Sequence, residues 1–182
     1  RQLFTYLCEQ ASVAARNVAR HASLHRQALT DDLTGLANHR RFQELLTDGH
    51  DRFKETGTRV GLILLDIDDF KGVNDRHGHD VGDRILCDVA EHLRGNVRAV
   101  DTVARIAGDE YVVICPAVIE SQLDDLVQRL GRTDHRVLPN GARGPHLSIG
   151  AVLATPHDTA ATALRRADEA MYAKKRFWTA RP

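Results

Sequence analysis

The sequence predicts an α/β (α+β) fold, in which a mixed sheet of about five strands is flanked by helices and preceded by one long helix. Two observations favour this class: apolar, strand-like runs alternate with segments of helical periodicity, and one pair of runs forms a clear hairpin. At 182 residues the chain can bury one full core, so one domain plus an extension is expected.

The elements follow in order along the chain. Residues 1–29 read as one helix without Pro or Gly, whose apolar positions recur at alternating three- and four-residue steps. We expect it to be a signalling or dimerisation helix that pairs with a second chain, and packing against its own domain is the alternative. His21 and His25 weaken its apolar seam, which comprises Phe4, Leu7, Ala11, Ala14 and Val18.

After this helix, Asn38 can cap a helix that starts near His39. Residues 60–65 have the composition of a buried strand, and residues 103–115 form the hairpin. The other predicted elements are helices over 84–93, 120–130 and 159–175 and a strand over 146–153.

The hairpin carries two acids at its tip. Gly108 and Asp109 form the kind of pair that a short turn needs, and Glu110 follows directly. Adjacent carboxylates repel each other, and a bound Mg²⁺ would favour them because hard ions take carboxylate oxygens and bridge to phosphates. A solvated acidic turn is the alternative.

A second acidic cluster, Asp-Ile-Asp-Asp at residues 66–69, ends the strand predicted over residues 60–65. Carboxylates at the end of a central strand, beside an acidic hairpin, suit a two-metal site for phosphoryl chemistry. The cluster is not an EF-hand loop, which needs an oxygen ligand at its fifth position and Gly at its sixth. Phe70 and Lys71 occupy those positions here.

Bulk composition restricts the expected partners and compartment. Lys plus Arg number 25, as do Asp plus Glu, so no net field favours nucleic acid or an anionic membrane. No apolar run approaches the length of a membrane span, and no signal-peptide pattern occurs. Cys8, Cys87 and Cys115 are far apart, which suits reduced thiols in a cytoplasmic protein. The helical pattern is already under way at Arg1, so we expect a fragment of a longer chain.

Five stretches, in order and at workable spacing, resemble the GGDEF family of diguanylate cyclases, which make cyclic di-GMP from two GTP. The stretch 107–111 (Ala-Gly-Asp-Glu-Tyr) resembles the Gly-Gly-Asp-Glu-Phe signature, and the other four are residues 31–40, 66–74, 78–83 and 167–175. The resemblance assigns residues 30–182 to a GGDEF domain with a ferredoxin-like core related to nucleotide cyclases. Residues 1–29 are similar to the closing helix of a GAF-type module, which implies an upstream sensor domain.

The resemblance implies roles for individual residues. Two Mg²⁺ (or Mn²⁺) ions per active site would be held by Asp66, the Ile67 carbonyl, Asp109 and Glu110. Asp109 would be the base for the ribose 3′-hydroxyl, Glu110 would lie close by, and Lys71 would offset charge on the phosphates. The substrate-binding residues would be Asn74, Asp83, Phe70, Leu86, Gly108 and Lys175, in a homodimer whose two GTP-loaded domains face each other.

Guanine recognition is the role that the resemblance gives to Asn74 and Asp83. An amide can meet the O6 side of guanine, while a carboxylate accepts from N1–H and the N2 amine. A turn former and a helix N-cap are the alternative roles of these two residues. His77 and His79 nearby are expected to be bystanders.

Arg98 and Asp101 match the Arg-x-x-Asp pattern of the family's inhibitory product site, where the Arg would grip phosphate and stack on guanine. A local ion pair is the alternative. Arg129 is the expected second contact to cyclic di-GMP, with Arg132 as its substitute.

Three positions depart from the family pattern. Ala107 replaces the first Gly of the signature and fits if its φ is negative. Tyr111 replaces Phe, and its hydroxyl needs a partner if it is buried. Thr179 stands where the family has an Arg, for which Arg176 or Arg181 would compensate. Two other functions therefore stay open: an inactive GGDEF-like module that binds GTP or cyclic di-GMP, and a structural dimerisation module.

Overall fold

The computed structural model describes residues 28–132, 146–155 and 158–179. Almost all of the helix expected over residues 1–29 lies outside this part of the chain, as does Arg181. The helices are α2 (His39–Thr56), α3 (Phe70–His77), α4 (His79–Asn96), α5 (Glu120–Leu130) and α6 (Ala160–Thr179). The strands are β1 (Val60–Ile67), β2 (Thr102–Ala107), β3 (Glu110–Pro116) and β4 (Leu147–Leu153).

The four strands form one antiparallel sheet in the order β2-β3-β1-β4. The predicted class, a sheet flanked by helices, is confirmed. The prediction of about five strands of mixed direction differs from the described sheet, which has four strands that all pair antiparallel. Within the described residues, the parallel pairing is a single bridge between Ala37 and Ala104. The chain before Ala37 is a turn with Gly35 at φ +64°, so this segment cannot continue as a strand.

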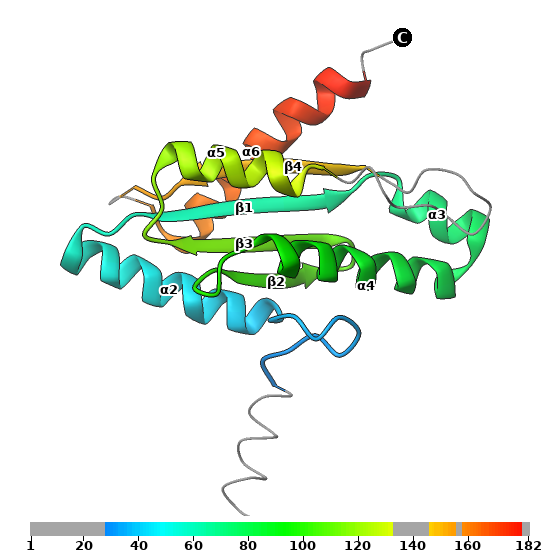
Figure 1. Cartoon of the computed structure of the whole chain (residues 1–182), viewed down its shortest axis with the longest axis horizontal. Helices are drawn as coiled ribbons and strands as arrows, with labels where there is room; N and C mark the ends of the chain where they lie inside the picture. The colour runs from blue at the N-terminus through cyan, green and yellow to red at the C-terminus, as the bar shows by residue number, and fades with distance from the viewer. Residues whose placement is uncertain (1–27, 133–145, 156–157, 180–182) are drawn as a thin grey trace, which may run out of the picture.

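Helices cover the sheet on both faces, with α4 and α5 on the face toward the viewer in Figure 1. Successive side chains of a strand point to opposite faces, and β1 supplies both cores. Ile63 and Leu65 pack with α4 and α5, while Leu62 and Leu64 pack with α2 and α6. Every residue of β1 is buried except Asp66, so an acid sits near the end of the most enclosed strand.

Asn38 caps α2 as expected. Its Oδ1 accepts the backbone N–H of Arg41 at 3.1 Å, and its Nδ2 donates to the carbonyls of Ala28 and Thr30 at 3.1 and 3.2 Å. The cap satisfies a first-turn N–H of the helix and fixes the segment that enters it.

The helix expected over residues 84–93 is longer than predicted, because α4 begins at His79. Gly78, at φ +83°, ends α3 and starts α4, a backbone conformation that glycine adopts without strain. Asp83 therefore lies inside the helix, and the alternative that made it an N-cap is wrong. The change of direction at Gly78 lays α3 beside α4.

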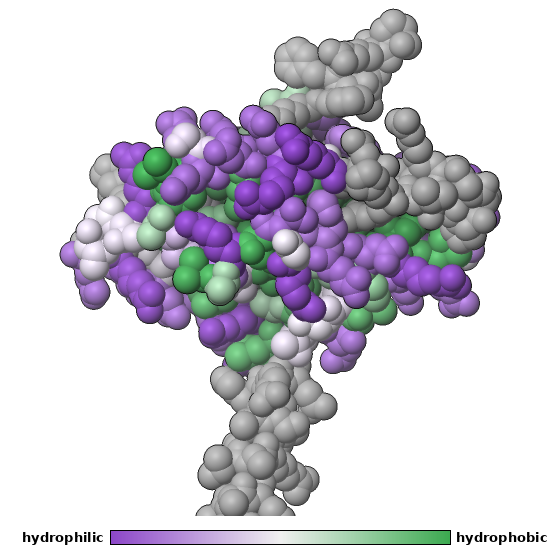
Figure 2. All heavy atoms as spheres, in the orientation of Figure 1, coloured by the Kyte–Doolittle hydropathy of each residue, from purple (hydrophilic) through white to green (hydrophobic). Residues whose placement is uncertain are grey.

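The surface in Figure 2 is mostly hydrophilic over α4 and α5, with separate small hydrophobic areas. Among the described helices, none combines the length and apolar character needed to cross a bilayer. Cys87 and Cys115 are free thiols, and burial raises the pKa of Cys115 to about 12.

Candidate active site

The acids of the hairpin and of β1 meet at one edge of the sheet. In the register of the strands, Asp66 lies opposite Glu110 on β3 and opposite Ser148 on β4. The Ile67 N–H donates to the carbonyl of Asp109 at 3.3 Å. The structure thus brings together all four residues predicted as metal ligands.

Lys175, from α6, lies directly on this edge. Its Nζ is 2.6 Å from Oδ1 of Asp66 and 3.1 Å from Oδ1 of Asp68. Gly150 on β4 makes this approach possible, because a Cβ there would lie 2.1 Å from a carbonyl and 2.4 Å from an N–H of the α6 backbone. The predicted phosphate contact is therefore held against the predicted metal ligand.

Electrostatics at the edge favour a bound cation. Burial raises the pKa of Asp109 above its usual value, and the neighbouring charge of Asp66 raises it further. Burial also raises the pKa of Glu110, together with the charges of Asp66, Asp109 and Asp168. Carboxylates whose charged forms are disfavoured in this way gain from any cation that neutralises them.

The donor types fit a hard divalent ion, which takes carboxylate and carbonyl oxygens. In the described segments, however, no group of three His, Cys, Asp or Glu side chains is assembled closely enough to hold an ion. The Lys175 ammonium occupies the position beside Asp66 instead. Burial lowers the pKa of this amine, but hydrogen bonds to Asp66 and Asp68 outweigh that effect and raise it overall.

Sequence reasoning placed Asp68 in the acidic cluster at residues 66–69 without an individual role, and it gave Arg105 no role. Asp68 follows Asp66 at the two-residue step that places both side chains on one face of a strand, and this spacing was an available signal. Arg105 holds the hairpin turn. Its Nε donates to the Gly108 carbonyl at 2.9 Å, and its Nη1 lies 3.1 and 3.2 Å from the two carboxylate oxygens of Asp31.

The residues expected to bind guanine lie on the α3–α4 pair. The amide oxygen of Asn74 is buried and has no hydrogen-bond partner among the described residues. Gly82 faces it, and a Cβ at Gly82 would lie 1.9 Å from that oxygen and 3.2 Å from the ring of Phe70. Asp83 is exposed one residue further on. The amide oxygen of Asn74 is thus packed against the backbone of Gly82 in its present position.

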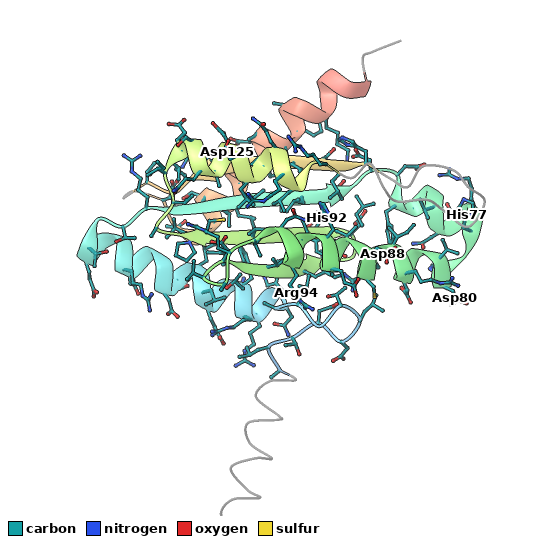
Figure 3. The ribbon with its side chains drawn as sticks, viewed as in Figure 1. His77, Asp80, Asp88, His92, Arg94 and Asp125 are labelled. Carbon is teal, nitrogen blue, oxygen red and sulfur yellow. The ribbon has the colours of Figure 1, made fainter. Side chains whose placement is uncertain are left out.

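Other expected site residues on α3 and α4 differ in exposure. Leu86 is 3% exposed and belongs to the core, so its side chain offers little surface to a ligand. Lys71 is exposed on the first turn of α3. His77 lies with Asp80 at the end of the α3–α4 pair that points away from the sheet (Figure 3).

Two of the three departures from the family pattern are accommodated. Tyr111 is fully buried, and its hydroxyl donates to the Leu86 carbonyl at 2.9 Å, which is the partner the sequence required. Ala107 is not at a positive φ, so its methyl group causes no backbone strain. Thr179 ends α6, and its side chain lies outside the described part of the structure.

Arg98 and Asp101 form the local ion pair that was the alternative reading of their motif. Arg98 Nη2 is 2.9 Å from Asp101 Oδ1 and Nε is 3.2 Å from Oδ2, and the Asp101 side chain is fully buried. Arg98 lines a surface hollow of about 330 Å³. Arg129 donates from Nε to the Asn96 carbonyl at 2.9 Å, and Arg132 is exposed.

A helix-flanked antiparallel sheet with acids at a hairpin tip is the architecture of a nucleotide-cyclase domain. The family described as "Diguanylate cyclase, GGDEF domain" matches residues 28–179, and the chain belongs to this family.

Two curated relatives show the extent of the similarity. Diguanylate cyclase DgcP of Pseudomonas aeruginosa is 37% identical over 154 residues, which is 82% of this chain and 23% of that protein. Response regulator PleD of Caulobacter vibrioides is 38% identical over 157 residues, 81% of this chain and 34% of that protein. The chain thus spans about a third or less of these relatives.

Among solved structures, the coiled coil and GGDEF domain of DgcB from Caulobacter crescentus, in complex with c-di-GMP, matches with a TM-score of 0.89. Its sequence identity is 28%, and the match covers 97% of this chain and 95% of that one. The predicted family is therefore confirmed.

Proposed function

We propose that this chain is a diguanylate cyclase domain that condenses two GTP molecules into cyclic di-GMP and releases two pyrophosphates. One observation carries the proposal: the strand register places Asp66 opposite Glu110 and beside the turn that holds Asp109, with the Lys175 ammonium 2.6 Å from Asp66. Membership of the GGDEF family and relatives named as diguanylate cyclases support it.

The acids prepare the attack of the ribose 3′-hydroxyl on the α-phosphate of the opposite GTP. Asp109, on the hairpin turn next to Glu110, is the proposed base for this hydroxyl. Two Mg²⁺ or Mn²⁺ ions, held by Asp66, Ile67, Asp109 and Glu110, would neutralise phosphate charge and lower the pKa of the attacking hydroxyl.

The substrate is positioned from two sides. Asn74 and Asp83 would read the guanine edge beside Phe70 and Leu86. Gly108, which has open space around its Cα, would allow phosphate to approach the backbone of the turn, with Lys175 at the terminal phosphate and Lys71 near the transferred group.

Each active site takes one GTP, so the reaction needs two domains facing each other in a homodimer. Residues 1–29 are proposed to pair the two chains and to carry the signal of an upstream sensor domain. The match to a structure that comprises the coiled coil and GGDEF domain of DgcB supports the pairing. Cyclic di-GMP is proposed to inhibit through Arg98, Asp101 and Arg129, or Arg132. The free thiols of Cys87 and Cys115 support a cytoplasmic setting.

The test is incubation with GTP and Mg²⁺, with the product identified by mass. We expect cyclic di-GMP from GTP and none of the adenine counterpart from ATP, and Asp83→Ser should relax this base preference. GTP binding without product would favour the inactive regulatory module. Absence of both binding and turnover would leave the structural dimerisation module.

A further inference from the structure

Asp68 has no part in the proposed chemistry, yet it is firmly held next to the site. Its Oδ1 accepts the Ser148 hydroxyl at 2.7 Å, and its Oδ2 lies 3.1 Å from Nδ1 of His146. Its backbone N–H also donates to the His146 carbonyl at 2.9 Å. These contacts fix the Asp68 carboxylate to the start of β4.

Lys175 is shared between this fixed carboxylate and that of Asp66, which is the proposed metal ligand. The ammonium lies 2.6 Å from Asp66 and 3.1 Å from Asp68. A divalent ion on Asp66 would meet the Lys175 ammonium at close range, and two cations on one carboxylate oxygen repel each other. An ion that takes the Asp66 oxygen contacted by Lys175 therefore competes with the ammonium for it, while the contact to Asp68 does not involve that oxygen.

We propose that Asp68 is a positioning residue that retains the Lys175 ammonium when Asp66 binds a divalent ion. The inference rests on the proposed function, which makes Asp66 a metal ligand. An ammonium has three donors, so one contact to Asp68 leaves others for a phosphate. Without Asp68, Lys175 loses one of the carboxylates that hold it, and its pairing with Asp66 competes more strongly with the ion.

The test is a double-mutant cycle on metal binding, read without turnover. Mn²⁺ binding is followed by the electron paramagnetic resonance of the free ion, both without nucleotide and with a GTP analogue that cannot cyclise. The proteins compared are the unmutated chain, Asp68→Asn, Lys175→Met and the double variant. A cycle isolates the coupling between two neighbouring residues from their separate effects.

Asp68→Asn should weaken Mn²⁺ binding by roughly three- to tenfold, the scale of one partly exposed charged contact. In the Lys175→Met background the same change should have less than about a twofold effect, because the competing ammonium is gone. If Asp68→Asn acted only through a general loss of negative charge, it would weaken Mn²⁺ binding by the same factor whether residue 175 is Lys or Met. Equal factors, or an unchanged affinity in Asp68→Asn, would overturn the proposal.

Ser148→Ala provides a second variant, which loosens Asp68 from β4 without changing any charge. It should weaken Mn²⁺ binding in the same direction, and only while Lys175 is present; an unchanged affinity contradicts the proposal. The matched control is Asp69→Asn, because Asp69 carries the same charge, is 68% exposed and pairs with Arg76.

The two hypotheses fail separately. If the chain converts GTP to cyclic di-GMP but Asp68→Asn weakens Mn²⁺ binding equally with and without Lys175, only the role of Asp68 is overturned. If GTP is not converted but the effect of Asp68→Asn on Mn²⁺ affinity depends on Lys175, the proposed function is wrong and the coupling between Asp68 and Lys175 stands. No Mn²⁺ binding by the unmutated chain in either condition would overturn the positioning role.

Discussion

The hydroxyl of Tyr111 donates to the carbonyl of Leu86 at 2.9 Å, which ties the signature hairpin to the helix that carries the proposed guanine contacts. Tyr111→Phe should lower the free energy of unfolding by about 0.5–1.5 kcal/mol, because one buried hydrogen bond is lost. Denaturant unfolding measures this. Tyr172→Phe, at a side chain exposed on α6, is the control and should change little.

Asp66→Ala and Asp109→Ala should each abolish GTP turnover and leave the domain folded. Each would remove a proposed oxygen ligand from a site that has few, and both residues are only partly buried, outside the hydrophobic core. Turnover and thermal unfolding are measured together, with Asp125→Ala on the exposed side of α5 as the control. Near-normal Mg²⁺-dependent activity in either variant would contradict the two-metal proposal.

Gly82→Ala should weaken GTP binding. The new methyl group would lie 1.9 Å from the amide oxygen of Asn74, so that side chain must turn away from its present position. Gly95 lies on the same helix with open space around it, so Gly95→Ala tests the effect of alanine on helix stability alone. If both variants bind a fluorescent GTP analogue equally well, Asn74 does not contact the base.

Arg98→Ala should raise the inhibitory concentration of cyclic di-GMP by about 10- to 150-fold, the loss of one charge-assisted bond of about 1.5–3 kcal/mol. It also leaves the buried Asp101 carboxylate without its cation, so the unfolding temperature should fall as well. Titration of product against initial velocity checks the first effect. Inhibition curves identical to those of the unmutated protein would limit Arg98 to the ion pair.

Asp158 should make the free energy of unfolding depend on pH. Burial raises its pKa, but hydrogen bonds from Thr155 and the charge of Arg166 outweigh burial and hold the pKa below the ordinary value of 3.8. A lowered pKa in the folded state stabilises the protein above about pH 4, and this contribution is lost as the pH falls through the folded pKa. Asp158→Asn should therefore destabilise by about 1–3 kcal/mol at pH 7.

The difference should shrink between pH 5 and pH 3, because the unfolded chain begins to bind a proton near the ordinary pKa of 3.8 while the folded carboxyl, whose pKa is lower, stays charged. Thermal unfolding at pH 7, 5 and 3 measures the difference. A constant difference across this range would show that the charge of Asp158 does not contribute.

Local signals in the sequence predicted the local structure well. The cap at Asn38, the two-residue turn between β2 and β3 and the limits of α5 all follow from neighbouring residues, and the structure confirms them. The start of α4 was predicted at residue 84 instead of His79, because Gly78 and Gly82 both precede residue 84 and glycine often interrupts a helix. Only Gly78 takes the positive φ, while Gly82 is needed for close contact with Asn74.

The contacts that complete the site could not be predicted in this way. Lys175 was expected at a phosphate because of a motif, and nothing in the motif shows that it also reaches Asp66 and Asp68. That contact depends on how closely α6 lies on β4, which Gly150 decides from another part of the chain. The ion pair between Arg105 and Asp31 likewise joins residues that are 74 positions apart in the sequence.

The ion pair of Lys175 with Asp66 joins residues 109 positions apart, and Ser148 meets Asp68 across 80. Contacts of such high contact order form late, because the entropy of closing the chain must be overcome first. During synthesis β1 emerges early, yet both of its neighbours in the sheet follow it. The candidate site is therefore expected to be completed last, and a nascent chain halted before β4 would display the signature turn without a finished site.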